Sequence, residues 1–408
     1  MELNERYKDG FISQIDASQR GEVVRIPVGL DRVGSVFNLL QSRYMLLAGS
    51  TGSGKTSLAD TLVVLNPWTL KKCGALPDIH WEVLYFSLER KQMFKHAKWI
   101  SWMIYRDWGY QISADEIMGW GDAPLSEEGY KLVRSYDDEM SELLDHIQMY
   151  DGKISSEVVK RAIHRRALDL GTFYYSDDEG VYKDDNPVYI ARFSDEGKIR
   201  KTKTGNRAYI ELTHDGEKFK IYEDDHRYFL KNPKTFVFVV IDGINLLGSK
   251  EEIDEISILV SDARDKYGFS PVIITQQNRS MGDIQRLKHH GGDLSPQLED
   301  IFKSSQMGFD ADLVVGLFDA LKYKAYDVEG KFDGYIIKQG TDGITGSLQT
   351  PGGHSRFRSI HILKNSFGPD GAKFGLKFIG ECSHFETLPK PDDEAAMAKI
   401  YAEVRQGK

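Results

Sequence analysis

The feature that most constrains this chain is a glycine-rich run between an apolar strand and an apolar helix. The run Gly49-Ser50-Thr51-Gly52-Ser53-Gly54-Lys55-Thr56 matches G-x-x-x-x-G-K-[ST] at every position. It follows the apolar segment Tyr44–Ala48 and precedes the apolar segment Leu58–Leu65, which is the strand–loop–helix context that the pattern requires. Glycines let the backbone curl so that several N–H groups point at one phosphate, and the helix N-terminus adds its dipole. We therefore expect residues 49–57, Ser57 included, to cradle a nucleotide phosphate.

The loop and a second carboxylate together predict ATP and Mg²⁺ as ligands. Lys55 is expected to reach the β- and γ-phosphates, and the Thr56 hydroxyl to bind Mg²⁺. The apolar strand Phe236–Ile241 ends in Asp242. Ligands gather at the carboxyl ends of parallel strands, so Asp242 is expected to hold the metal through water, with helix capping as the alternative.

The remaining apolar runs indicate the fold class. The segments Val83–Ser87, Val272–Thr275, Leu313–Phe318 and Ser359–Leu363 are rich in Val, Ile and Leu and alternate with helical patterns. Strands that are apolar throughout are typical of a mostly parallel sheet buried on both faces, which predicts an α/β fold. Residues 102–170 are expected to be mostly helical. Their apolar side chains at helical spacing include Leu132, Met140, Leu143, Leu144 and Ile147.

Residues 171–235 change character and predict a β-rich insertion. They alternate β-forming residues with Asp-Gly, Glu-Gly and Thr-Gly turn signals. The basic run Lys198–Lys203 is either part of a solvated hairpin or a platform for DNA or a protein partner. The expected organisation is a polar lead-in at 1–35, a first ATPase half at 36–170, the insertion at 171–235, a second half at 236–388 and a polar tail at 389–408.

Composition bounds the location and the partners. The 408 residues carry a formal net charge of −9, which does not indicate a nucleic-acid binder and does not exclude one, because bulk charge reports on solubility and not on fold. No stretch approaches the roughly 18 apolar residues of a membrane span, so no membrane partner is expected. The two cysteines, Cys73 and Cys382, lack metal-ligand spacing, and a reducing cytoplasm is expected.

Hydrolysis needs a group that orients or deprotonates the attacking water. Asp242 is followed by Gly243, so an acidic residue directly after the metal aspartate is absent. Glu89, just after the strand Val83–Ser87, is the candidate base, with a solvated residue at a helix start as the alternative.

Outside the insertion, the chain from about Arg25 to Leu388 resembles the ATPase domain of DnaB-type replicative helicases, a RecA-like P-loop family. Ser87-Leu88-Glu89 is similar to the family's Ser-Leu-Glu-Met, and Thr275-Gln276-Gln277-Asn278-Arg279 to Ser-Gln-Leu-x-Arg. Asp310-Ala311-Asp312 matches the family's Asp-Ala-Asp segment. The resemblance implies a RecA-like P-loop NTPase core with Glu89 as catalytic base and Gln276 as γ-phosphate sensor.

Two departures from the family stand out. Lys364-Asn365-Ser366-Phe367-Gly368 occupies the place of Lys-x-Arg-x-Gly, whose Lys and Arg reach a neighbouring subunit's γ-phosphate. Lys364 is present, but Ser366 replaces the arginine, and a trans arginine contributes greatly to phosphoryl transfer. Arg358, or Arg356, is the nearest substitute, and slow hydrolysis is the alternative. Only about 35 residues precede the motor, so Glu5–Ile15 is either a linker helix or a frayed terminus. This short lead-in suggests a phage or mobile-element version in a host cytoplasm.

The resemblance also implies where single-stranded DNA binds. The cations of the two expected DNA loops are Lys250, Arg279, Arg286 and Lys288, and a flexible surface loop is the alternative for the second. The predicted function is an ATP-dependent replicative DNA helicase, a homo-oligomeric ring and expected hexamer, with primase, polymerase or loader proteins as possible partners. The alternatives are a RecA-, RadA- or KaiC-like ATPase, or a nucleotide-gated loader or adaptor that hydrolyses ATP weakly.

Overall fold

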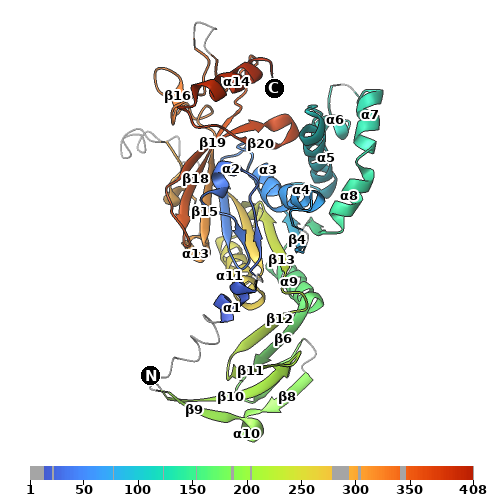
Figure 1. Ribbon diagram of the computed structural model, residues 1–408, viewed down its shortest axis with the longest axis vertical. Helices are drawn as coiled ribbons and strands as arrows, with labels where there is room; N and C mark the ends of the chain where they lie inside the picture. The colour runs from blue at the N-terminus through green and yellow to red at the C-terminus, as the bar shows by residue number, and fades with distance from the viewer. Residues whose placement is uncertain are drawn as a thin grey trace.

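The computed structural model describes residues 13–20, 23–76, 78–122, 124–152, 154–184, 188–202, 205–277, 294–301, 305–340 and 346–407. Within them, a nine-stranded sheet forms the centre of the molecule (Figure 1), in the order β20-β19-β18-β15-β3-β14-β13-β4-β5. The strands are β3 (Met45–Gly49), β4 (His80–Ser87), β5 (Ile147–Asp151), β13 (Thr235–Asp242), β14 (Ser270–Gln276), β15 (Leu313–Phe318), β18 (Phe357–Asn365), β19 (Lys373–Ile379) and β20 (His384–Thr387). The pairs from β15 to β5 are parallel, and those from β15 to β20 are antiparallel.

The central strands are buried on both faces, and their side chains divide between two hydrophobic layers. In β13, Phe236, Phe238 and Val240 face one layer, while Val237, Val239 and Ile241 face the other. Successive side chains of a strand point to opposite faces, so a strand without polar residues needs cover on both sides. The predicted α/β fold with a mostly parallel sheet is confirmed by this arrangement.

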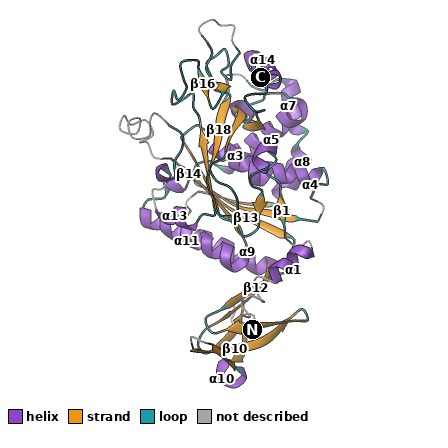
Figure 2. Cartoon of the chain, turned by 60° about the vertical axis from the view of Figure 1, so that its left-hand side comes forward, coloured by secondary structure: helices purple, strands orange, loops and turns teal. Residues whose placement is uncertain are grey.

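Helices cover both faces of the sheet (Figure 2). One layer contains α3 (Lys55–Asp60), the π-helical turn Thr61–Leu65, α4 (Asn66–Lys72), α5 (Gln92–Trp108) and α8 (Asp137–Leu144). The other contains α9 (Ser156–Leu170), α11 (Lys250–Tyr267) and α13 (Ser305–Asp310). Shorter helices α6 (Ala114–Ile117) and α7 (Glu127–Arg134) lie beside α5. None of the described helices is both long enough and apolar enough to cross a bilayer.

The expectation of mostly helical structure through residue 170 needs a correction. Ile147, expected on a helix, begins the edge strand β5, which pairs in parallel with β4. The short run Ile147–Asp151 has one fully buried end and mixed exposure along the rest. A five-residue segment at a sheet edge becomes a strand because it can hydrogen-bond to β4. The helical spacing of apolar residues in the sequence carries no information about that pairing.

The β-rich stretch forms two small sheets that project from the core, at the bottom of Figure 1. Strands β6 (Gly171–Ser176), β7 (Gly180–Lys183), β8 (Val188–Arg192) and β12 (His226–Leu230) make one sheet, and β9 (Lys198–Thr202), β10 (Gly205–His214) and β11 (Glu217–Tyr222) make the other, with α10 (Phe193–Glu196) between. Tyr174, Val181, Ala191, Ile210 and Ile221 form a separate apolar cluster there. This insertion therefore has its own small hydrophobic core.

The insertion is joined to the ATPase core at one place. Its first and last strands pair, so that Gly171 is the direct partner of Leu230. The Tyr228 hydroxyl donates to the Ala167 carbonyl of α9 at 2.7 Å, and the Tyr228 ring lies 5.2 Å from that of Tyr267 on α11. The chain thus leaves the core and returns to it at neighbouring positions.

The ends of the chain pack on the core as well. Helix α1 (Ser13–Gln19) includes the last residues of the expected linker segment Glu5–Ile15, whose remainder lies outside the described residues. Strands β1 (Arg25–Ile26) and β2 (Leu39–Leu40) pair with each other, and α2 (Asp31–Gly34) lies between them. Helix α14 (Glu394–Arg405) buries Met397 and Val404 in a third apolar cluster. Part of the expected polar tail therefore belongs to a packed helix.

The paired ends of the insertion generate a testable expectation. Replacement of residues 172–229 by a short Gly-Ser linker should leave a folded, nucleotide-binding core, because the Cα atoms of the two junction residues are only about 5 Å apart in such a pair. Thermal unfolding should report a loss of about 1–2 kcal/mol from the missing Tyr228 contacts. Tyr228→Phe, which removes only the bond to Ala167, should cost about 1 kcal/mol. Loss of cooperative unfolding in the deletion variant would contradict an independent insertion.

Candidate nucleotide site

The glycine-rich loop has the backbone that phosphate binding requires. Gly52 and Gly54 have φ values of 78° and 96°, in the left-handed region, and Gly54 is the residue from which α3 begins. A Cβ atom on Gly54 would lie 2.9 Å from the Phe378 ring, so a side chain is excluded there by both space and conformation. The N-terminus of α3 therefore opens directly onto the loop, as an anion site needs.

The loop side chains are held inward. Lys55 is buried, and its Nζ donates to the Ser50 carbonyl oxygen at 3.0 Å. Burial lowers the pKa of Lys55, while the nearby carboxylates of Glu89 and Asp242 oppose the shift. The hydroxyls of Ser50 and Ser53 are buried without a hydrogen-bond partner among the described residues. Buried polar groups are normally paired, so these hydroxyls fit a loop whose partner is a ligand.

Thr56 and Asp242, the two residues expected to bind the metal, lie in contact with each other. The Thr56 hydroxyl donates to Asp242 Oδ1 at 2.9 Å, and Asp242 is fully buried at the carboxyl end of β13. Both groups offer the oxygen ligands that Mg²⁺ prefers. No group of three or more His, Cys, Asp or Glu able to hold a metal occurs in the described part of the chain. A Mg²⁺ ion here would therefore take its other ligands from phosphates and water, and the two residues fit that role.

Glu89 and Gln276 lie together beside the loop, although they are far apart in the sequence. Gln276 Nε2 donates to Glu89 Oε1 at 3.5 Å, and Glu89 is exposed. Gly243 makes room for this glutamate, because a Cβ atom on Gly243 would lie 2.6 Å from Glu89 Cγ. The residue after Asp242 has to be small, which explains why the acidic group comes from a different strand.

The sheet register explains how these residues meet. Asp242 is the partner of Ser87 on β4 and of Ile274 on β14, and Gln276 is the partner of Gly49 on β3. The carboxyl ends of the parallel strands β3, β14, β13 and β4 therefore end at one level of the sheet. Asn245 adds a link, since it accepts from the Thr275 hydroxyl at 3.0 Å and donates to the Gln276 carbonyl at 3.5 Å.

Arg358 lies against the phosphate loop of its own chain. Its side chain is buried, its Nε donates to the Ser53 carbonyl at 2.8 Å, and its Nη1 is 3.0 Å from Asp319 Oδ2. Burial lowers the pKa of Arg358, and Asp319 opposes the shift. Arg356 is buried too, and it pairs with Glu381. These contacts argue against our expectation that Arg358 reaches a neighbouring subunit, and they favour a role in supporting the loop.

A cavity of about 470 Å³ borders the loop on this side. Its walls come from the loop, from α5 and from the strands that carry Arg358 and Phe378. The residues that line it include Gly52, Gly54, Ser57, Lys98, Asp319, Arg358, Phe378 and Gly380. Lys322 lies nearby and donates to the Thr51 carbonyl at 2.5 Å. The site thus has space for a group attached to the phosphates and one more cation at its rim.

Lys364 and Ser366 lie at the opposite end of the sheet. Lys364 pairs with Val314, which pairs with Leu46, so along the strand direction Lys364 lies three residues, or roughly 10 Å, from the level of Gly49. Lys364 Nζ donates to the Gly308 and Phe309 carbonyls at 3.0 and 3.4 Å. The Lys364 ammonium therefore contacts α13 and not the phosphate loop of its own chain.

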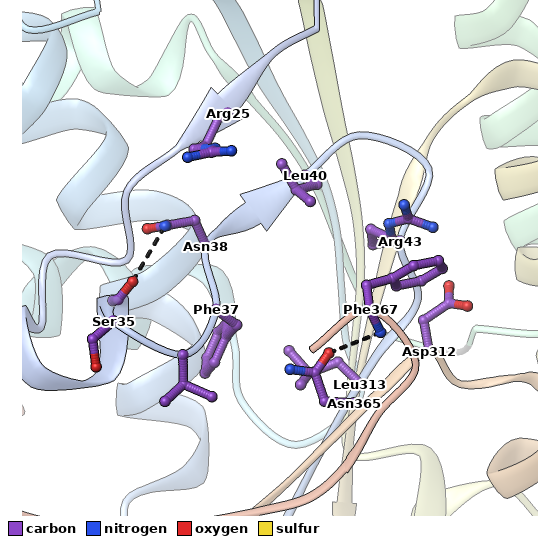
Figure 3. A pocket seen from close by; sticks show the side chains of 12 residues that line it. Arg25, Ser35, Phe37, Asn38, Leu40, Arg43, Asp312, Leu313, Asn365 and Phe367 are labelled. Carbon is purple, nitrogen blue, oxygen red and sulfur yellow. Dashed lines mark hydrogen bonds between the residues drawn. The ribbon is translucent and has the colours of Figure 1, made fainter. Parts of the chain in front are cut away.

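Arg43 lies at the same end, beside a pocket of about 220 Å³ (Figure 3). Its guanidinium carbon is 3.1 Å from the centre of the Phe367 ring, directly after Ser366. Its Nε is buried without a hydrogen-bond partner among the described residues, and burial lowers the pKa of Arg43. Asp312 lies next to it and accepts from the Tyr44 N–H at 2.9 Å and from Arg264 Nη1 at 3.1 Å. The Asp-Ala-Asp segment thus holds the start of β3.

The expected DNA-binding residues have different outcomes. Lys250 is exposed at the first position of α11. Arg279, Arg286 and Lys288 lie outside the described residues. In the insertion, Lys198 is paired with Glu211, and the side chains from Arg200 to Lys203 are not among those described.

Sequence reasoning missed several polar residues near the site. Lys95 on α5 lies 2.8 Å from Asp242, and Asp60 on α3 accepts from the Tyr85 hydroxyl at 2.7 Å. Burial alone would lower the pKa of Lys95, but the carboxylates of Asp242 and Asp60 outweigh it and raise this pKa. A charged residue inside the apolar helix run Leu58–Leu65 was the available signal for Asp60. Lys95 is one of two lysines on α5, with Lys98, and spacing alone does not single it out.

No protein-family model and no curated protein sequence matches the chain. Similar solved structures are known. A structure of an isolated ATPase domain matches 95% of this chain and 100% of its own length, at 16% identity and a TM-score of 0.55. A DnaB-like replicative helicase, solved for its interactions with primase, matches 95% of this chain and 69% of its own, also at 16% identity and a TM-score of 0.55.

The chain has the fold of these ATPase domains. The resemblance to DnaB-type helicases is thereby confirmed at the level of the fold, and the expected RecA-like core with it. The match to a KaiC-like protein from the archaeon Pyrococcus horikoshii OT3 covers 90% of this chain and 100% of that protein's chain, at 14% identity and a TM-score of 0.40.

The space left by Gly243 makes a direct test of the position of Glu89. In Gly243→Ala the new methyl group collides with Glu89 Cγ, and the φ of +90° strains the backbone. We expect ATP turnover to fall by about 10²-fold, as for a displaced general base, while nucleotide affinity stays within a few-fold. Gly248→Ala is the control, because its Cβ would meet no described atom within 4 Å and its φ is not positive. Equal turnover in both variants would contradict the assignment of Glu89.

Proposed function

We propose that this protein is an ATP-hydrolysing motor of the DnaB-helicase kind, which moves along single-stranded DNA as a homo-oligomeric ring. One observation carries the proposal. Glu89 and Gln276 meet at 3.5 Å beside a phosphate loop whose Thr56 hydroxyl lies 2.9 Å from the buried Asp242. A nucleotide cradle, a metal-binding carboxylate, a base and a polar sensor are the parts that hydrolysis of a nucleoside triphosphate requires.

The phosphate loop would bind the β- and γ-phosphates of ATP. The N–H groups at the start of α3 and the Lys55 ammonium, which bonds to Ser50 at present, would donate to phosphate oxygens instead. Thr56 and Asp242 would hold Mg²⁺, which neutralises charge on the phosphates when it is bound. The cavity of about 470 Å³ beside Gly52 and Arg358 has the size of a small-molecule site, and we propose it for the ribose and base.

Glu89 would act as the general base. Its exposed carboxylate can accept a proton from a water molecule placed in line with the γ-phosphate. Gln276 donates to this carboxylate now, and the same amide could turn to a γ-phosphate oxygen when ATP is bound. Arg279, Arg286 and Lys288 follow Gln276 closely in the sequence. We propose that the exchange of Gln276 partners couples hydrolysis to this DNA-binding loop, with Lys250 as a further contact.

The proposed partners follow from the chemistry and from the similar structures. Loops that carry Lys and Arg suit single-stranded DNA without sequence preference. One similar structure is that of a DnaB-like replicative helicase solved for its interactions with primase, and a primase-type partner is proposed here on that ground. The ring is proposed because Lys364 lies at the end of the sheet opposite its own phosphate loop and does not contact that loop.

We propose that Lys364, with Arg43, supplies the positive charge that a neighbouring subunit's nucleotide needs. Ser366 is neutral and stands where the family has a positively charged arginine. Arg43 lies over the ring of the adjacent Phe367. A cation from the next subunit would stabilise the charge on the transferred phosphoryl group. Arg358 would serve the nucleotide of its own chain through Ser53.

The second candidate function is a nucleotide-gated loader or adaptor with weak hydrolysis. The observation that favours it is the loss of the arginine at Ser366 together with the burial of Arg358 and Arg356 in their own chain. Such a protein would bind ATP through the same loop and hydrolyse it slowly whether or not DNA is present.

ATP turnover with and without single-stranded DNA separates the two functions. For the motor we expect DNA to stimulate turnover in the wild type, and Lys55→Ala to abolish it. Glu89→Gln should reduce turnover by about 10²- to 10⁴-fold and keep ATP binding, because only the proton acceptor is lost. Slow turnover that ignores DNA would favour the loader, and wild-type turnover in Glu89→Gln would remove that residue from the mechanism.

Mixing two impaired variants tests the trans role of Lys364. Lys55→Ala lacks a working loop, and Lys364→Ala should lose about 10²- to 10³-fold in turnover, as for other lost transition-state donors. In mixed rings, the intact loop of one variant meets the intact Lys364 of the other, and turnover should partly return. Lys55→Ala mixed with Arg358→Met is the matched control and should stay inactive, because both lesions lie in the same site. No recovery in the first mixture would refute a trans role.

A further inference from the structure

Behind the proposed metal site lies a cluster of charged groups that the mechanism above does not use. Lys95 is only 1% exposed, and its Nζ donates to Asp242 Oδ2 at 2.8 Å. The same ammonium lies 3.5 Å from Asp60 Oδ1. A lysine that is almost fully buried is unusual and needs paired acceptors, which the two carboxylates provide.

Two further side chains complete the cluster. The Tyr85 hydroxyl donates to Asp60 Oδ1 at 2.7 Å and also contacts Lys95. The Trp99 indole N–H donates to Asp60 Oδ2 at 3.2 Å. Both oxygens of Asp60 are therefore occupied, and the carboxylate cannot turn toward the nucleotide.

The two oxygens of Asp242 have different partners. Oδ1 accepts from Thr56, on the side of the phosphate loop, and Oδ2 accepts from Lys95 at 2.8 Å and from the Tyr85 hydroxyl at 3.5 Å, on the side of the core. Hydrogen bonds at both oxygens fix the plane of a carboxylate, and outer contacts of this kind orient the groups that bind a metal. Lys95 makes the shorter of the two bonds to Oδ2, the oxygen of Asp242 that lies away from Thr56.

A lysine next to a metal-binding carboxylate creates an electrostatic problem. Paired with Asp242 alone, Lys95 would cancel the negative charge that attracts a divalent cation. Asp60 restores it, because two carboxylates and one ammonium leave one net negative charge. The three charged groups therefore form a unit that both holds Asp242 and keeps it attractive to Mg²⁺.

We propose that Lys95 is a positioning residue for Asp242 and that Asp60 sets the charge of the metal site. The inference rests on the proposed function, because it concerns the Mg²⁺ that accompanies ATP. Lys95 does not touch the nucleotide in this arrangement and acts only through Asp242. A purely structural ion pair would stabilise the fold in the same way but would leave the dependence on Mg²⁺ unchanged.

The decisive variant is the double substitution Lys95→Met with Asp60→Asn. It keeps the net charge of the cluster at minus one and removes the bond to Asp242 Oδ2. Binding of a fluorescent ATP analogue is measured as a function of Mg²⁺ and again in EDTA. We expect the half-saturating Mg²⁺ concentration to rise by about 10- to 100-fold, as for other lost outer contacts of a metal site. Affinity in EDTA should match the wild type.

A control variant tests whether any buried lysine would have this effect. Lys377 is 2% exposed and pairs with Glu403 at 3.0 Å and Glu386 at 3.4 Å, away from the phosphate loop. Lys377→Met should lower the melting temperature and leave the half-saturating Mg²⁺ concentration unchanged. Asp60→Asn alone, which keeps Lys95 on Asp242 but neutralises the cluster, should also raise that concentration, by about tenfold.

The outcomes separate this inference from the proposed function. A wild type with no affinity for the ATP analogue overturns both. Normal nucleotide affinity combined with a wild-type Mg²⁺ dependence in the folded double variant overturns the inference alone. If the double variant does not fold, the single Asp60→Asn variant decides, and an unchanged Mg²⁺ dependence there has the same meaning.

Discussion

The parallel ladder of β3, β14, β13 and β4 is the constraint on which the rest of this structure depends. Its register brings Gly49, Gln276, Asp242 and Ser87 to the same edge of the sheet. Peptide hydrogen bonds between the strands thus position the phosphate loop and the residues proposed as metal ligand, sensor and base, although Glu89 and Gln276 alone lie 187 residues apart in the sequence. A shift of one residue in any of these strands would turn every side chain to the opposite face and dismantle the site.

Asp242 and Arg358 are buried at the same edge, and each of these charged residues has polar or charged partners from other segments. Asp242 is held by Thr56 and Lys95, and Arg358 is held by Asp319 and the Ser53 carbonyl. Burial of an unpaired charge is costly, so each of these residues depends on partners from other segments. A mutation at this edge therefore changes both the chemistry and the packing, which is why the double variant and its matched control are needed to separate the two.

The two ends of strand β18 carry Arg358 and Lys364, which lie at opposite ends of the sheet. Because β18 runs antiparallel to β15, Lys364 lies at the level of Leu46. Arg358, near the other end of the same strand, contacts the phosphate loop. One strand thus contacts the phosphate loop of its own chain at one end and carries Lys364, which bonds to α13, at the other. The insertion leaves this arrangement undisturbed, because its two ends, Gly171 and Leu230, lie opposite each other in an antiparallel strand pair.

Local patterns in the sequence were sufficient for several conclusions. The phosphate loop, the apolar strands and the α/β class were predicted because their signals lie within short windows of the chain. Residue spacing and the family resemblance together also led to Glu89 and Gln276, which the structure brings to one site. The edge strand β5, the Lys95–Asp60 pair and the inward position of Arg358 could not be predicted in this way. Each depends on contacts between segments that are distant in sequence, and hydrogen bonds and ion pairs of that kind exist only after the chain has folded.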